Sequence, residues 1–308
     1  MISNLNNIVC FGEVLWDVIP EGPQPGGAPL NVAYHLAKLK NKVSIISRVG
    51  MDRKGEDLIK LITKWGIQKN FLQVDTYYAT SQVLAKMNSG RDVAYDIVNP
   101  CAWDFITEDR KALEGINQAQ YFVYGSLSAR NIGTKETLYN LLENNTYKVF
   151  DINLRPPYFD KEVLGHLLQK ADFAKLNEHE LAAVVELFDC NYEQENAQVN
   201  FLRERFAINE VVITRGEAGA SYYLGNAIYH YKGHPVDVKD TIGCGDAFLA
   251  SFISSHLLQE SPEAILRNAV AMGGFVATKK GGCPEYELEE FEEFCHNYVG
   301  SISAKLKY

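Results

Sequence analysis

The sequence predicts an α/β fold in which a mostly parallel sheet carries helices on both faces. Short runs rich in β-branched and aromatic residues alternate with longer segments whose apolar residues recur at helical spacing. Two neighbouring pairs of strands are joined by short turns instead of helices. Strand–helix alternation of this kind builds a parallel sheet, because each crossover must return along one face of it.

The expected elements follow one another in this alternating order. In the first half, strands are expected at 7–11, 43–47, 121–124 and 148–152, and helices at 30–39, 55–64 and 135–143. In the second half, strands are expected at 173–176, 210–214, 221–224 and 227–231, and helices at 178–187, 246–258, 262–279 and 288–299. The chain therefore ends in a helical third, and residues 1–308 are expected to form one domain.

Two strand pairs interrupt the alternation. Strands at 81–85 and 92–98 flank a turn that contains Gly90, so they are expected to form a hairpin. A hairpin cannot lie inside a purely parallel sheet, and this one is expected to project as a flap. The pair at 221–224 and 227–231, joined by Gly225 and Asn226, fits an antiparallel edge of the main sheet.

Charge and composition exclude several classes of function. The 308 residues carry a net charge of −9, which argues against a nucleic-acid or anionic-membrane partner. No segment approaches the roughly 20 apolar residues of a membrane-spanning helix, and the N-terminus lacks the pattern of a secretory signal. The six cysteines are scattered without zinc spacing, so they are interpreted as reduced thiols of a cytoplasmic protein.

The strongest local signal lies at residues 240–248, where Gly243 and Gly245 precede the start of a helix. Free N–H groups at a helix N-terminus, together with the helix dipole, form an anion site. The segment is neither a Walker A loop nor a Rossmann fingerprint, because the required Lys and third Gly are missing. Asp246 then has two interpretations: a base beside a transferring phosphoryl group, or a residue that caps the helix.

A second signal follows the first strand. Asp17 lies at the end of the segment 12–17, and Asn31 follows the Gly- and Pro-rich stretch 22–29. Ligands of open α/β sheets bind beyond the carboxyl ends of the strands, and Asp and Asn together suit a polyol. The alternative is an ordinary loop rich in Gly and Pro that leads into a helix.

These segments together resemble the PfkB (ribokinase-like) family of carbohydrate kinases, in its fructokinase-like branch. The resemblance rests on six motifs in the family's order, and it covers nearly the whole chain. They are GGAPLNVA at 26–33, RVGMDRKG at 48–55, DINLRP at 151–156, NEHE at 177–180, TRGEAG at 214–219 and DTIGCGDAF at 240–248. The family implies a three-layer α/β/α fold with a small β-hairpin lid, formed here by elements around 12–30 and 78–100. Tyr77, Tyr78 and Tyr95 are candidates for a homodimer interface through that lid, and the alternative is that they reflect the strand propensity of Tyr.

The resemblance also implies roles for individual residues at the sugar and the phosphoryl group. Asp246 would deprotonate the sugar hydroxyl, while the backbone N–H groups of Gly243, Cys244 and Gly245 would hold the charge of the transferring phosphoryl. The residues implied at the sugar are Asp17, Gly27, Asn31 and Asn153, with Tyr95 and Arg155 as further candidates. For Arg155 the alternatives are a phosphate contact or an ion pair at the end of a strand.

The nucleotide and the cations are assigned in the same way. ATP would lie along Asn177, Thr214, Gly216 and Gly219, with Asn268 and Gly273 at the border of the adenine. Glu180, with Asn177, would organise Mg²⁺ through water, which Mg²⁺ tolerates well. Asp240, the carbonyl of Thr241 and carbonyls near Gly282 would hold a monovalent cation such as K⁺.

Two positions depart from the family's pattern. Cys244 replaces the usual Ala, either as a redox-sensitive thiol or as a tolerated buried substitution. Val98 stands where many fructokinase-like members carry an Arg before Asn-Pro. An Arg there would suit a substrate carboxylate, so its absence favours a neutral ketose, fructose above all, over 2-keto-3-deoxygluconate.

Rival functions remain at this stage. Within sugar kinases the rivals are 2-keto-3-deoxygluconate kinase and ribokinase. From other classes they are a catalytically silent sugar-binding sensor and, more remotely, a nicotinamide dehydrogenase. His35, His179 and His234 have no partner at catalytic spacing, so they are expected on helix surfaces or in loops.

Overall fold

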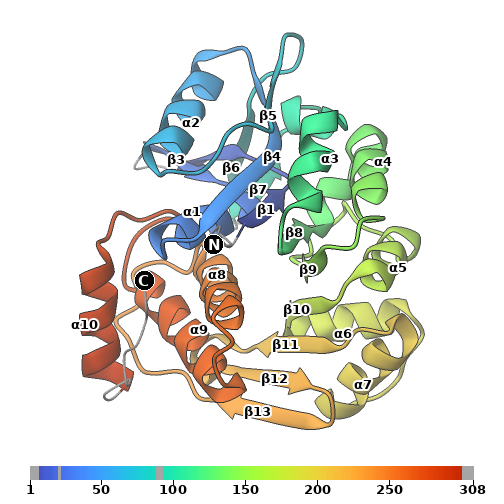
Figure 1. The fold of residues 1–308 in the computed structure, drawn as a ribbon, viewed down its shortest axis with the longest axis vertical. Helices are drawn as coiled ribbons and strands as arrows, with labels where there is room; N and C mark the ends of the chain where they lie inside the picture. Colours follow the sequence, from blue (N-terminus) through green and yellow to red (C-terminus); the bar gives the residue numbers. More distant parts are fainter. Residues whose placement is uncertain (1–6, 20–21, 88–92, 300–308) are drawn as a thin grey trace, which may run out of the picture.

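The architecture is a large, mostly parallel sheet between two layers of helices, with a small second sheet beside it (Figure 1). The computed structural model describes residues 7–19, 22–87 and 93–299, with side chains absent from the description at 85–96 and 298–299. The nine strands of the large sheet, in spatial order, are β13 (Ala227–Tyr231), β12 (Ala220–Leu224), β11 (Glu210–Thr214), β10 (Phe173–Asn177), β9 (Tyr147–Asp151), β8 (Tyr121–Gly125), β1 (Asn7–Phe11), β4 (Lys42–Gly50) and β5 (Leu72–Asp75). All neighbours from β5 to β11 are parallel, and β12 and β13 add an antiparallel edge.

The helices divide between the two faces of this sheet. One face carries α1 (Ala28–Lys38), α2 (Arg53–Lys64), α8 (Cys244–Leu257), α9 (Pro262–Ala277) and α10 (Leu288–Val299). The other carries α3 (Arg110–Asn117), α4 (Ile132–Leu141), α5 (Lys161–Lys170), α6 (Glu178–Leu187) and α7 (Glu195–Phe206). Three short 3₁₀ helices, Ala102–Phe105, Ser126–Ala129 and Gly216–Ala218, lie in the connections.

The central strands are buried on both sides, as parallel strands under two helical layers must be. In β1, Ile8 and Cys10 join the core beneath α1 and α8, whereas Val9 and Phe11 join the core beneath α3 to α7. All four side chains are inaccessible to solvent. The two hydrophobic cores therefore meet at the sheet, and they fix the positions of the helix N-termini at its edge.

The small sheet has the strand order β3 (Gly22–Gly26), β2 (Leu15–Ile19), β6 (Ser81–Met87) and β7 (Val93–Ile97). Strands β6 and β7 are antiparallel, which confirms the expected hairpin outside the main sheet. Strand β3 was expected to be a loop because of its prolines. It is tolerated because it is an edge strand, where Pro23 and Pro25 need not donate to a further neighbour.

The main sheet and the order of helices confirm the expected fold class, with shifts of one to three residues at element ends. The elements that the periodicity did not reveal are β2, β3, β5, α3, α5 and α7. Two of the unexpected helices carry a clear start signal, since Asp109 caps α3 and Asp160 caps α5 through backbone N–H groups. Within the described part of the chain, no helix has both the length and the apolar character needed to cross a membrane.

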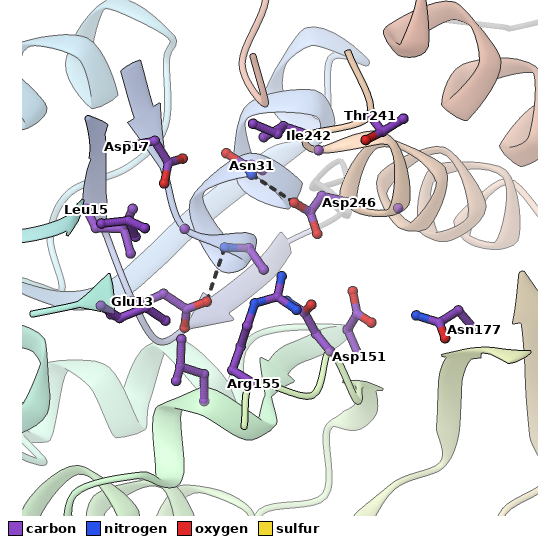
Figure 2. Close-up of a pocket in the computed structure, with 18 of the residues that line it drawn as sticks. Glu13, Leu15, Asp17, Asn31, Asp151, Arg155, Asn177, Thr241, Ile242 and Asp246 are labelled. Atoms are coloured by element: carbon purple, nitrogen blue, oxygen red, sulfur yellow. Dashed lines mark hydrogen bonds between the residues drawn. The ribbon is translucent and has the colours of Figure 1, made fainter. Parts of the chain in front are cut away.

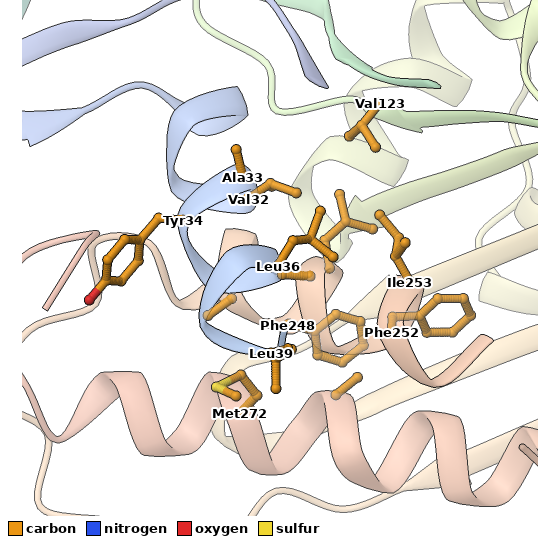
Figure 3. Packing of buried hydrophobic residues seen from close by; sticks show 14 of the residues in the cluster. Val32, Ala33, Tyr34, Leu36, Leu39, Val123, Phe248, Phe252, Ile253 and Met272 are labelled. Atoms are coloured by element: carbon orange, nitrogen blue, oxygen red, sulfur yellow. The ribbon is translucent and has the colours of Figure 1, made fainter. Parts of the chain in front are cut away.

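Helices α1 and α8 pack against each other under the sheet (Figure 3). Val32 and Leu36 of α1 lie in the same buried cluster as Phe248 and Phe252 of α8, and Met272 of α9 closes it from below. The contact brings the first turns of α1 and α8 together, although they are more than 200 residues apart in sequence. The site described below is built on these two turns.

The chain leaves the small sheet through Val98, whose carbonyl accepts a hydrogen bond of 2.8 Å from Arg130 Nη2. Arg130 also pairs with Asp104 at 2.7 Å, and both side chains are fully buried. Arg130 therefore holds the backbone at Val98 in place from the protein interior. Of the three tyrosines considered for a dimer interface, Tyr77 is exposed, Tyr78 stacks on Phe105, and the side chain of Tyr95 is not described.

Candidate active site

A cavity of about 780 Å³ opens between the small sheet and the carboxyl ends of the main strands (Figure 2). The segments that line it come from β2, the first turn of α1, the loop after β9, the end of β10 and the first turn of α8. Among the described residues lining it are six carboxylates and two cationic side chains: Glu13, Asp17, Asp151, Glu180, Asp240, Asp246, Arg155 and Lys175. The lining is thus strongly acidic, and its positive charges are those of Arg155 and Lys175.

The first turn of α8 forms one wall of the cavity. Gly243 is its N-cap, with a φ of 75°, and a Cβ at this position would lie 2.5 Å from Cα of Gly282. A larger residue could not make this turn. The first N–H groups of α8 have no acceptor inside the helix, and that of Cys244 lies 3.4 Å from the Thr241 carbonyl oxygen. Gly243 and Gly245 line the cavity, whereas the side chain of Cys244 packs away from it.

Asp246 lies in the same turn and is held by a residue from α1. Asn31 Nδ2 donates a hydrogen bond of 2.8 Å to Asp246 Oδ2, while Asn31 Oδ1 accepts one of 3.2 Å from the Cys283 thiol. Burial raises the pKa of Asp246 to about 6 and repulsion from Asp151 adds to the rise, against the opposing effects of Lys175 and the Asn31 hydrogen bond. A carboxylate so placed is ionised at neutral pH and is nevertheless a stronger proton acceptor than an ordinary Asp.

The opposite wall carries Glu13, Asp17 and Arg155. Burial raises the pKa of Asp17 to about 6, and the positive charge of Arg155 opposes that rise. Arg155 is exposed within the cavity, and its Nη1 donates a hydrogen bond of 3.0 Å to the carbonyl of Leu154. Gly27 precedes α1 with a φ of 107°, and a Cβ there would lie 2.4 Å from the carbonyl oxygen of Glu13. Asn153 also lines the cavity, in a left-handed conformation with a φ of 39°.

A buried ion pair lies at the base of the cavity, between two neighbouring strands. Lys175 Nζ donates to both carboxylate oxygens of Asp151, at 2.8 and 2.9 Å. Burial lowers the pKa of Lys175 more than any other single effect, but the carboxylates of Asp151, Glu180 and Asp246 together outweigh it and hold that pKa above its usual value. The ammonium lies only 3.3 Å from the position of a Cβ on Gly245, so it stands beside the opening of α8. The sequence motifs assigned no role to either residue of this pair.

Asn177 and Glu180 form a capping box at the start of α6. Asn177 Oδ1 accepts from the Glu180 N–H at 2.9 Å, and Glu180 Oε2 accepts from the Asn177 N–H at 2.8 Å. The second carboxylate oxygen of Glu180 accepts from the Leu154 N–H at 3.0 Å. Each carboxylate oxygen therefore already accepts one backbone N–H. The remaining lone pairs suit hydrogen bonds from the water molecules of a hydrated cation better than direct contact with a bare cation. No group of three or more potential ligands among His, Cys, Asp and Glu occurs in the described residues.

The expected nucleotide residues separate into two groups. Asn177 and Thr214 line the cavity, at the ends of the adjacent strands β10 and β11. Gly216 begins the short 3₁₀ helix that follows β11 and Gly219 comes directly after it, and neither residue lines the cavity. A Cβ on Gly219 would meet the carbonyl of Tyr231 at 2.0 Å, so this glycine is required by close packing against β13.

Asn268 and Gly273, expected at the border of the adenine, lie in α9 and do not line the cavity. The Asn268 amide donates to Ser255 Oγ at 3.1 Å and to Glu260 at 2.8 Å, so it links α9 to the end of α8. Gly273 lies under the start of α8, where a Cβ would come within 3.3 Å of the Cys244 carbonyl. In this structure both residues serve helix packing.

Asp240 and Thr241 line the cavity just before α8. The Asp240 carboxylate accepts from the Ile242 N–H at 3.0 Å and from the Gly281 N–H at 2.9 Å, which ties the two loops together. The carbonyl of Gly282 faces His35 Nε2 at 3.0 Å, and His35 Nδ1 faces the Tyr286 hydroxyl. The expectation that His35 is on a surface is wrong: the ring is fully buried, and burial lowers its pKa to about 4.

Burial, with Asp240 and Asp246 nearby, raises the pKa of Cys244 to about 12. The thiol is thus kept protonated at the helix start, which favours the tolerated substitution over a redox-sensitive cysteine. The described cysteines are all free thiols, in agreement with the absence of a disulfide framework.

Sequence reasoning missed three charged residues of the cavity: Glu13, Asp151 and Lys175. Each had a signal, since an ionisable residue inside or directly after a fully buried strand must have a partner or a function. Lys175 interrupts the apolar run of β10, and Asp151 ends β9.

Comparisons with known proteins assign this arrangement to a family. The family model described as "pfkB family carbohydrate kinase" matches residues 6–287. Fructokinase-2 of Oryza sativa subsp. japonica is 28% identical over 310 residues, which cover 91% of this chain and 90% of that protein.

Solved structures show the same fold. A fructokinase of Xylella fastidiosa with bound ATP has a TM-score of 0.82 at 22% identity, covering 95% of this chain and 99% of that one. A fructokinase of Vibrio cholerae with fructose, ADP and a calcium ion has a TM-score of 0.80 at 23% identity, covering 95% and 99%. A double mutant of the latter was solved with fructose, ADP and a potassium ion, at a TM-score of 0.79 and 23% identity, covering 94% and 98%.

The Asn31–Asp246 hydrogen bond predicts a measurable change in acidity. Replacing the donor by Asn31→Leu should raise the pKa of Asp246 above about 6, because the hydrogen bond stabilises the ionised carboxyl group. Carbon-13 NMR titration of the side-chain carboxyl groups measures this directly. Asn41→Leu is the matched control, since Asn41 also bonds to α8 but at its far end, through Ser254. An unchanged or lowered pKa in Asn31→Leu would contradict the assignment.

Proposed function

Because the chain belongs to the PfkB family of carbohydrate kinases, we propose that this sugar kinase transfers the γ-phosphate of ATP to a hydroxyl of a neutral ketose, with fructose as the substrate. One observation carries the proposal. The Asp246 carboxylate stands in the first turn of α8, in the same cavity as Asp17 and Asn31. An acceptor for a hydroxyl proton and an anion-binding helix start are thus side by side.

In the proposed mechanism Asp246 accepts the proton of the attacking sugar hydroxyl. The N–H groups of Gly243, Cys244 and Gly245 face the transferring phosphoryl group and stabilise the negative charge on its oxygens. Phosphoryl transfer needs alignment and charge neutralisation more than covalent help. Asn31 orients the base, because its amide is itself fixed by the Cys283 thiol.

Two side chains add positive charge to this arrangement. Lys175 lies beside Gly245 and is held by Asp151, so we place it next to the phosphoryl group as a fixed charge. Arg155 reaches into the cavity from the loop after β9, without an ion pair among the described residues, and can contact the phosphates or the sugar. Together they offset the acidic lining where the phosphates would be.

The residues at the ends of β10 and β11 suit a nucleotide and its metal. Asn177 and Glu180 would hold hydrated Mg²⁺ through water, which fits a carboxylate whose oxygens already accept two backbone N–H groups. Bound Mg²⁺ would neutralise phosphate charge. Thr214 would lie along the phosphates, and the adenine would lie beyond it toward α9.

A keto-acid substrate is the second candidate, and the position of Arg155 favours it. An unpaired guanidinium in a substrate cavity suits a carboxylate, as 2-keto-3-deoxygluconate would provide. Against it stand Glu13 and Asp17 on the same wall, and Val98 in place of an arginine. We therefore place the neutral ketose first and the keto acid second.

A monovalent cation is proposed beside Asp240 and the carbonyl of Thr241. The Asp240 carboxylate joins the loop before α8 to Gly281, so a cation held there would order the start of α8. A double mutant of the Vibrio cholerae fructokinase was solved with a potassium ion. Because His35 faces the Gly282 carbonyl, that carbonyl is a poorer candidate ligand than expected.

A substrate panel tests the proposed function. With Mg-ATP, purified protein should release ADP with fructose at a higher kcat/KM than with ribose or 2-keto-3-deoxygluconate, measured by a coupled ADP assay. Faster turnover of the keto acid would transfer the assignment to the second candidate. No ADP release with any common sugar, combined with measurable sugar binding, would indicate a sensor.

The base assignment predicts the effect of Asp246→Asn. This variant should lower kcat by about 10²–10⁴ while the Kd for fructose, measured by calorimetry, changes little. In the unaltered enzyme, kcat/KM should fall as the pH drops below about 6, because a protonated Asp246 cannot accept the proton. Asp17 and Glu13 titrate nearby, so the profile belongs to the group of carboxylates. Asp57→Asn, on the outer surface of α2, is the control. Near-normal turnover of Asp246→Asn would remove it from the base role.

The cation site predicts a dependence on the salt used. Activity in KCl should exceed activity in NaCl of equal ionic strength, and Asp240→Asn should reduce the difference. Equal rates in the two salts would argue against a monovalent-cation site at Asp240.

A further inference from the structure

Glu13 carries a buried carboxylate oxygen with no partner in the described part of the protein. The residue is 3% exposed. Its Oε1 accepts a hydrogen bond of 3.2 Å from the Ala28 N–H at the start of α1, whereas Oε2 is buried and unpaired. Buried polar atoms are rarely left in this state, because the loss of hydration is not compensated. The unpaired oxygen therefore requires an explanation outside the protein's own hydrogen bonds.

The backbone fixes where this carboxylate lies. Glu13 follows β1 directly, at the carboxyl edge of the sheet, and lines the cavity with Asp17 and Asn31. The turn at Gly27 lies against the Glu13 backbone, so closely that a Cβ there would come within 2.4 Å of its carbonyl oxygen. Figure 2 shows Glu13 on the side of the cavity that carries Asp17 and Leu15, with Arg155 extending into the same space. Glu13 thus belongs to the wall opposite α8.

The chemistry of this atom selects the kind of group it can meet. Burial raises the pKa of Glu13 to about 7, and its own backbone N–H, the charge of Arg155 and the Ala28 N–H oppose that rise. When ionised, the oxygen is an acceptor that repels carboxylates and phosphates. When protonated, it still needs a hydrogen-bond partner. A neutral hydroxyl group satisfies both states, since it can donate or accept.

We propose that Glu13 is a specificity-determining residue of the sugar site, whose Oε2 accepts a hydrogen bond from a sugar hydroxyl and disfavours a carboxylate at the same position. The proposal rests on the proposed function, namely that this cavity binds a sugar. It adds an acidic contact remote from Asp246, on the part of the sugar that is not phosphorylated. It also gives a reason for the preference for a neutral polyol that does not depend on Val98.

The test compares Glu13→Gln with the unaltered enzyme. Gln retains an oxygen for the Ala28 N–H and places a donor where Oε2 accepted. The Kd for fructose, measured by calorimetry, should rise about 10- to 100-fold, the size of effect typical of a lost hydrogen bond to a charged group. The ratio of kcat/KM for 2-keto-3-deoxygluconate to that for fructose should rise as well. Glu290→Gln is the matched control, because its carboxylate also accepts a backbone N–H but lies on α10.

A series of monodeoxy-fructoses identifies the hydroxyl concerned. One analogue should bind the unaltered enzyme and Glu13→Gln equally weakly, because the contact is missing in both cases. The proposal is overturned if Glu13→Gln binds fructose normally, or if it weakens every analogue by the same factor, as loss of the Ala28 contact alone would do. Should Glu13→Gln fail to fold, NMR titration of Glu13 in the unaltered enzyme replaces it. Fructose should lower the pKa of Glu13, and the monodeoxy-fructose that lacks the contacting hydroxyl should not.

The two proposals fail in different ways. Sugar binding without ADP release would overturn the kinase mechanism and leave the Glu13 contact testable by calorimetry. Normal ADP release with an unaffected Glu13→Gln would overturn the Glu13 contact alone. A protein that binds no sugar would overturn both.

Discussion

The packing of α1 against α8 is the constraint on which the site depends. Apolar residues of both helices share one buried cluster, and this places Asn31 within hydrogen-bond distance of Asp246. The hydrogen bond joins residues that are 215 positions apart in the sequence. It therefore depends on the folded domain, and no local segment holds the site on its own.

The sequence predicted the fold class well, because the signals for strands and helices lie within short segments of the chain. Alternating apolar strands and amphipathic helices are visible over ten residues, and the glycines of the segment 240–248 mark the start of α8. The segments 12–31 and 240–246 were also expected near a common ligand, and the structure brings both into one cavity. Strand β3 could not be expected from composition, because prolines are acceptable there only through its position at a sheet edge.

The roles of several site residues could not be read from the sequence, because they depend on what each side chain meets in three dimensions. Asn268 was expected to contact the adenine, yet its amide group donates its hydrogen bonds to Ser255 and Glu260. Glu180 was expected near a metal, and its carboxylate first secures the start of α6 and the loop at Leu154. Asp151 begins one of the motifs and Lys175 lies outside all of them, and only the parallel pairing of β9 with β10 joins the two residues.

The acidic lining of the cavity has a consequence for how a nucleotide reaches it. Around the described cavity, carboxylates outnumber cationic side chains by six to two, so its field opposes the approach of a free polyanion. A nucleotide chelated by a divalent cation meets less of this barrier than the bare anion does. For the nucleotide proposed above, the encounter itself would favour the chelated form before any specific contact is made. Added salt, by screening the repulsion, would accelerate association rather than slow it.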